Sequence, residues 1–254
     1  MKEIVIPQKG TLVNRTTISF LAAVAMLLAL VTVTAQEKGK AWSDWSKKDA
    51  EKVLNDSPWA QTQTDTDTSQ MFYSPTYLPG TSGVNQTRSR EGATNQAVDV
   101  KFRVRFFSAR PIRQALVRLI ELQQKPTPDV AQKLSNFAEV KSADSIIVTV
   151  TFESNDQRYS GIVMQAFNSA ATGTLKNNSY LERNDGKRLF LEEYVPPGKD
   201  GFGARFIFLR HLDGQTFITK DTGEVRFFAQ YSNGIKIDRR FKVADMIYKG
   251  GLEY

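Results

Sequence analysis

Residues 203–243 read GARFIFLRHLDGQTFITKDTGEVRFFAQYSNGIKIDRRFKV and decide the fold class. Turn sequences at 211–214, 220–223 and 232–234 separate four apolar runs, and Asp-Gly or Asn-Gly supplies the positive φ of tight hairpins. In the last run Ile235, Ile237, Phe241 and Val243 alternate with charged residues, a period of two that indicates half-buried strands. We therefore expect an antiparallel meander on which the rest of the domain packs.

The region before this stretch mixes helical and strand periodicities. Residues 98–106 and 146–152 alternate as strands, and residues 180–194 form a hairpin pattern around Asn184-Asp185-Gly186. Helical stripes begin at Pro111 and after Thr127, and a third covers 155–170. Long alternating βα units are missing, so we predict an α+β domain over residues 98–254, with a mostly antiparallel sheet and helices packed on one face.

An uncharged apolar run occupies residues 18–35, after Lys2, Lys9 and Arg15. Small or modest residues at Val33 and Ala35 fit a cleavage site, so we interpret residues 1–35 as a signal peptide. The alternative is an uncleaved membrane anchor at residues 18–35, because 18 apolar residues just span a bilayer. The prediction is an exported protein, periplasmic or extracellular.

A short helix is expected within residues 36–60. Ser46 and Asp49 have the spacing of a capping box, and the proline of Asp56-Ser57-Pro58 ends the helix. About two turns of helix are unstable alone in water, so this segment needs a surface on which to pack. It is either a helix that docks on the main domain or a partner-binding segment, whose anchors would be Trp42, Trp45 and Trp59.

Residues 61–97 are rich in Thr, Gln, Asn, Ser and Gly. A chain so poor in apolar residues buries too little surface to offset the entropy lost on ordering. We therefore expect a flexible linker between the short helix and the α+β domain.

Two segments carry a resemblance. The tryptophan pair and the Ser57-Pro58-Trp59-Ala60 ending of residues 42–60 resemble the start of an uncharacterised secreted bacterial protein family. The sequence FKVADMIY at 241–248 is similar to the ends of the same proteins. The resemblance implies an exported location and no known activity, and no functional residue follows from it.

Composition excludes several chemistries. The chain has no cysteine and a single histidine, His211, so disulfides, thiolate zinc sites and a multi-histidine metal site within one chain are impossible. His211 stands near Asp213 without a recognisable nucleophile motif. Acidic residues gather around the 180–194 hairpin, and paired carboxylates such as Glu182 and Glu192 can hydrolyse a glycosidic bond. We predict no catalytic residue, no metal and no cofactor, but this hydrolase alternative stays open.

Basic residues share the polar faces of two predicted strands. If those strands are neighbours, one sheet face carries a cationic patch that suits an anionic glycan, a lipid headgroup or nucleic acid. The formal net charge of +7 also fits a face that only keeps the protein in solution. The residues of the expected anionic-ligand site are Lys101, Arg103, Arg105, Lys236, Arg240 and Lys242.

These observations favour an exported, non-enzymatic binding or scaffold protein of the bacterial cell envelope. The alternative is an exported hydrolase that uses Glu182, Glu192 or His211. The expected partners are an anionic envelope component or another envelope protein, with no specific nucleic acid. Membrane contact is expected only through an uncleaved signal segment.

Overall fold

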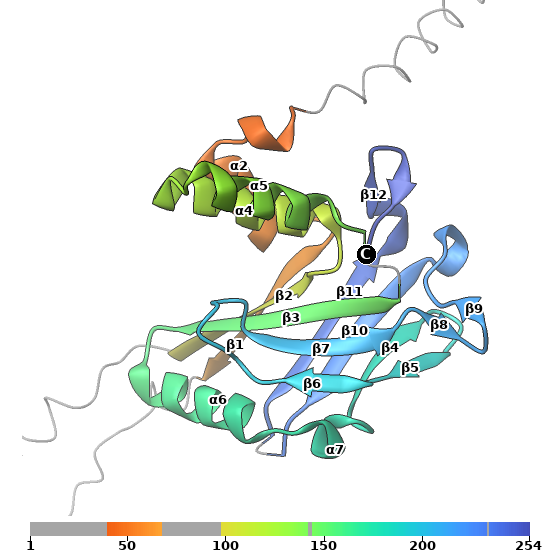
Figure 1. The fold of residues 1–254 in the computed structure, drawn as a ribbon. Helices are drawn as coiled ribbons and strands as arrows, with labels where there is room; N and C mark the ends of the chain where they lie inside the picture. Colours follow the sequence, from red (N-terminus) through yellow and green to blue (C-terminus); the bar gives the residue numbers. More distant parts are fainter. Residues whose placement is uncertain (1–39, 68–97, 142–143, 233) are drawn as a thin grey trace, which may run out of the picture. The chain divides into compact units, whose positions relative to one another are not determined.

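The structure is a computed structural model that describes residues 40–67, 98–141, 144–232 and 234–254 (Figure 1). The expected signal segment at 1–35 and most of the expected linker lie outside these residues. Among the described helices, none has the length and apolar character needed to cross a membrane. The described residues from Trp42 to Tyr254 form one compact unit.

Two antiparallel sheets make up most of this unit. The five-stranded sheet has the order β1-β2-β3-β7-β6, and the four-stranded sheet has the order β11-β10-β4-β5. The strands of the first sheet are β1 (Ala60–Asp67), β2 (Val98–Phe106), β3 (Ser145–Ser154), β7 (Ala204–Leu209) and β6 (Glu193–Val195). Those of the second are β11 (Lys236–Lys242), β10 (Glu224–Gln230), β4 (Ser179–Arg183) and β5 (Arg188–Phe190).

The sheets face each other across an aromatic core. Phe206 of β7 lies 5.1 Å from Phe227 of β10 between ring centroids, and Phe106 of β2 lies 4.9 Å from Phe241 of β11. All four rings are almost fully buried. Alternation along each strand therefore defines an inner face that meets the other sheet and an outer face that meets solvent.

The sandwich is closed differently at its two sides. At one side the chain crosses from β5 to β6, and two consecutive backbone N–H groups donate to different sheets. The Leu191 N–H donates to the Ser179 carbonyl of β4, and the Glu192 N–H donates to the Ile207 carbonyl of β7. At the other side the Gln63 side chain of β1 bridges to the edge of β11. Its amide nitrogen donates to the Lys236 carbonyl at 2.7 Å, and its oxygen accepts from the Asp238 N–H at 2.8 Å. A side-chain amide thus satisfies backbone groups that an unpaired edge would expose.

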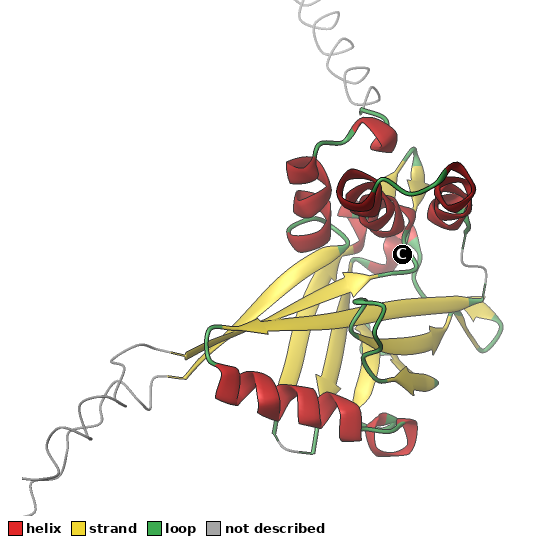
Figure 2. Ribbon diagram, turned by 60° about the vertical axis from the view of Figure 1, so that its left-hand side comes forward, coloured by secondary structure: helices red, strands yellow, loops and turns green. Residues whose placement is uncertain are grey.

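Helices lie at opposite ends of the sandwich (Figures 1 and 2). Helix α4 (Arg110–Gln124) follows the end of β2, and α5 (Pro128–Glu139) and α2 (Lys47–Asn55) pack against it. Helix α6 (Gln157–Ser169) follows β3 at the other end, and α7 (Thr172–Leu175) comes next. The shorter elements are η1 (Trp42–Asp44), β8 (His211–Leu212), β9 (Gln215–Thr216), η2 (Lys220–Thr222), η3 (Val243–Asp245), β12 (Ile247–Tyr248) and β13 (Gly251–Leu252).

The predicted α+β class with mostly antiparallel sheets is confirmed. The helices do not cover one face of a single sheet, because the second sheet occupies the inner face of the first and leaves its ends to the helices. The capping box of α2 is present: the Ser46 hydroxyl accepts from the Asp49 N–H at 3.2 Å, and the Asp49 carboxylate accepts from the Ser46 N–H at 2.9 Å.

Two expectations about chain organisation were wrong. The runs of residues 203–243 do not form one meander, since β7 pairs with β3 and β6, whereas β10 pairs with β4 and β11. The expected linker is also too long, because residues 61–67 belong to β1, which pairs with β2 from Ala60 opposite Arg105 to Asp67 opposite Val98. Residues 61–67 are polar and bury little surface by themselves, but their pairing with β2 orders them as a strand.

Candidate ligand-binding face and cleft

The six basic residues of the expected anionic-ligand site do not form one patch. Lys101, Arg103 and Arg105 lie on the outer face of the five-stranded sheet, whereas Lys236, Arg240 and Lys242 lie on the outer face of the four-stranded sheet. Because the inner faces of the two sheets meet, the outer faces point away from each other. The expectation of a single shared face is therefore wrong.

The basic residues of β2 are largely committed to internal contacts. The Arg105 guanidinium donates to the Leu54 carbonyl at the end of α2 at 2.6 Å and to the Thr151 hydroxyl at 2.9 Å. Burial, followed by the nearby Arg103 charge, lowers the pKa of Arg105 to about 10. Arg103 pairs with Glu153 at 2.5 Å, and Lys101 is exposed. Arg105 thus holds α2 on the sheet and is not available to a ligand.

The outer face of the four-stranded sheet carries a network of ion pairs. Arg226 of β10 binds both carboxylate oxygens of Asp238 at 2.7 and 2.6 Å and also contacts Glu182 at 3.3 Å. Glu182 in turn accepts from Arg188 of β5 at 2.5 Å. Arg240 sits directly opposite Arg226 on the edge strand β11 and forms no ion pair with a described residue.

An aromatic row runs across the same face, next to the ion pairs. Phe228, Tyr180 and Phe190 occupy neighbouring register positions on β10, β4 and β5, with ring centroids 5.0 and 5.9 Å apart. The Arg188 guanidinium lies 4.3 Å from the Tyr180 ring centroid, and 46% of Phe190 is exposed. Aromatic and cationic side chains therefore interleave over three strands.

The tryptophans expected as partner anchors mostly serve the fold. Trp59 is 8% exposed, and its indole nitrogen donates to the Glu253 carbonyl at 2.8 Å, so it belongs to the core and cannot contact a partner. Trp45 is half-buried against the core, and the indole nitrogen of Trp42 donates to Glu139 at 2.9 Å. These contacts dock the N-terminal segment on α4 and α5.

Glu182, one of the side chains considered for hydrolysis, is held in ion pairs with Arg188 and Arg226. The hydrogen bond from Arg188, helped by Arg226, holds the pKa of Glu182 below its usual value, although partial burial acts the other way. A general acid needs a raised pKa, so Glu182 is unsuited to that role. Glu192 is exposed where the chain crosses between sheets, and His211 is exposed on the two-residue strand β8. Within the described residues, no group of three or more acidic or histidine side chains could hold a metal ion.

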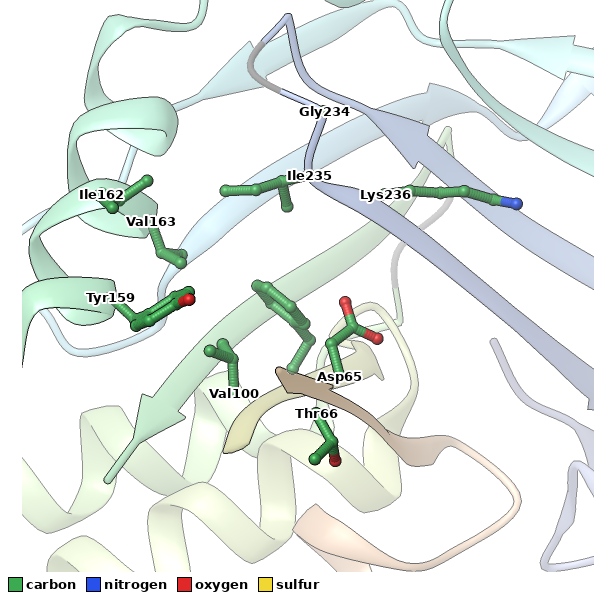
Figure 3. A pocket seen from close by; sticks show the side chains of 10 residues that line it. Asp65, Thr66, Val100, Tyr159, Ile162, Val163, Gly234, Ile235 and Lys236 are labelled. Atoms are coloured by element: carbon green, nitrogen blue, oxygen red, sulfur yellow. The ribbon is translucent and has the colours of Figure 1, made fainter. Parts of the chain in front are cut away.

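A cleft of about 430 Å³ opens beside α6, and its existence was not predicted from the sequence (Figure 3). Ile162 and Val163 of α6 point toward Ile235 on the β10–β11 hairpin, with Val100 of β2 on another wall. Asp65 of β1 stands at the polar side. The lining residues come from four separate elements, so no local sequence pattern could indicate the cleft.

Comparisons with known proteins add no assignment: no family model, no curated protein and no solved structure matches this chain. The candidate sites therefore rest on the geometry of the described residues.

Proposed function

We propose that this chain is an exported, non-enzymatic binding protein of the bacterial cell envelope that holds an anionic polysaccharide on the outer face of the four-stranded sheet. The observation that carries the proposal is the exposed position of Lys236, Arg240 and Lys242 on edge strand β11, beside the aromatic row. An open face fits an extended polymer, because successive units can contact successive strands.

The chemistry of the face supports an acidic sugar polymer. Exposed aromatic rings such as Phe190 offer flat apolar area against which sugar rings stack. Arginine and lysine side chains supply charge-assisted hydrogen bonds to carboxylate or sulfate groups. Export is supported by the apolar run at residues 18–35.

The test is retention of the full chain on immobilised polygalacturonate or heparin over a salt gradient. Arg240→Glu should elute at clearly lower salt than wild type, because one attractive charge becomes repulsive. Lys101→Glu is the matched control, since it makes the same charge change on the outer face of the other sheet. Both are exposed positions, where substitutions change stability by less than about 0.5 kcal/mol.

If Arg240→Glu and Lys101→Glu lower the eluting salt concentration equally, retention depends only on the net charge of the protein and not on the position of the charge. No retention of the wild type on either polymer would remove polysaccharide binding from consideration. A Phe190→Ala variant separates the aromatic contribution, and it should weaken retention at a salt concentration where wild type is still held.

A further inference from the structure

We infer that the cleft between α6 and the β10–β11 hairpin binds a small amphiphile with an apolar chain and an ammonium head group. The cleft lies where the edges of β1 and β11 are joined only by side chains such as Gln63, near the end of the sandwich that α6 covers. Its volume of about 430 Å³ falls within the range of small-molecule sites, roughly 300–1,000 Å³. Of the three basic residues of the proposed polysaccharide-binding face, only Lys236 also lines the cleft.

The walls of the cleft supply the apolar half of the site. Ile162, with 52% of its surface exposed, and Val163, which is buried, face Ile235 across the opening (Figure 3). Phe102 of β2 is 2% exposed and also lines the cleft. A chain that covers these side chains gains about 0.8 kcal/mol for each CH₂ group removed from water. The exposed surface of Ile162 is then buried as well.

The polar side of the cleft decides the head group. Asp65 lines both the cleft and an adjoining polar hollow that Gln63, Lys236 and Asp238 complete. The Gln63 amide donates to the Asp65 carboxylate at 3.0 Å, but no described cation forms an ion pair with Asp65. This carboxylate is therefore hydrogen-bonded but not ion-paired, beside an apolar opening.

Lys236 also lines the cleft, but its ammonium group is directed toward Asp238, at 3.7 Å. Asp238 accepts two hydrogen bonds from Arg226 as well, and Arg226 is shared with Glu182. In Figure 3 the Lys236 side chain extends away from α6. An ammonium group at the apolar opening is thus attracted to Asp65, whereas a carboxylate or sulfate head at the same place would be repelled by Asp65.

Isothermal titration of the full chain with dodecylamine, below its micelle concentration and at low ionic strength, tests this inference. Dodecylamine should bind at least about fivefold more tightly than dodecanoate, which corresponds to about 1 kcal/mol for one exposed charge pair. Asp65→Asn should remove most of that preference. Arg240→Glu should leave amine binding unchanged, so this site can fail or succeed independently of the polysaccharide proposal.

Two variants of α6 locate the site. Ile162→Lys places a charge in the cleft and should weaken dodecylamine binding by at least about tenfold. Met164→Lys is the control, because Met164 is also exposed on α6, at 42%, but does not line the cleft. Its dissociation constant should stay within about twofold of wild type, as expected for one surface substitution away from the site. Equal binding of amine and carboxylate, or equal effects of both lysine variants, would overturn the inference.

Discussion

Arg113 of α4 should be among the most sensitive positions of this fold. Its side chain is 4% exposed and donates to four backbone carbonyls. The acceptors at the end of β2 are Phe107, at 3.4 Å, and Ser108; those near the end of α5 are Phe137, at 3.2 Å, and Val140. One guanidinium therefore joins three elements and places positive charge at the C-terminus of α5, where the helix dipole favours it.

Arg113→Met keeps most of the side-chain volume but removes every donor. Phe107 and Ser108 are themselves 9% and 3% exposed, so their carbonyls should not recover full hydration. An unsatisfied buried acceptor costs about 1–3 kcal/mol, so two of them lower the free energy of unfolding by about 2–6 kcal/mol. Burial lowers the pKa of Arg113. The group stays protonated at neutral pH, and the loss should not depend on pH between about 5 and 8.

Urea denaturation followed by tryptophan fluorescence and circular dichroism measures this loss. Lys133→Met on the exposed face of α5 is the control, and it should change the free energy of unfolding by less than about 0.5 kcal/mol. Arg113→Lys should fall between the two, because an ammonium reaches fewer carbonyls. A loss below about 1 kcal/mol for Arg113→Met would refute the reasoning that these carbonyls depend on the guanidinium.

Three further predictions follow from other positions. Gly203 has φ +80°, and an added Cβ would clash with the Val150 carbonyl, whereas Gly201 has φ +76° with open space around it. In a melting experiment Gly203→Ala should therefore lose several times more stability than Gly201→Ala. Equal losses for the two variants would contradict this prediction. Burial raises the pKa of Tyr194 to about 12, so the stability that the protonated hydroxyl supports is complete below the unfolded pKa of about 10 and is lost as pH rises toward 12. Between pH 9 and pH 11, urea titrations should show a smaller decrease in the free energy of unfolding for Tyr194→Phe than for wild type. Identical decreases would exclude Tyr194 as the cause of the pH dependence. N-terminal sequencing of exported protein should begin at Gln36, and a start at Met1 would favour the membrane anchor.

The sequence determined the elements that depend on local periodicity. The alternation of β2, the apolar stripes of α4 and α6 and the capping box at Ser46 are all found where the pattern placed them. Alternate residues of a strand face the core and the solvent, and one stripe of a helix faces the core, whichever elements pack against them. These patterns can therefore be read from a single sequence. The α+β class follows from their order.

Only the tertiary structure decided which faces meet. The alternation of β7 and β10 is equally regular, yet the two strands belong to different sheets, because pairing depends on partners far away in the sequence. The packing of the two sheets also separated the two halves of the expected basic patch and buried Trp59 in the core. It placed β1 beside the edge of β11, where the Gln63 side chain bonds to the backbone of that strand. Periodicity says which face of a strand is buried, whereas the packing of whole sheets decides what covers it and which hollows are left.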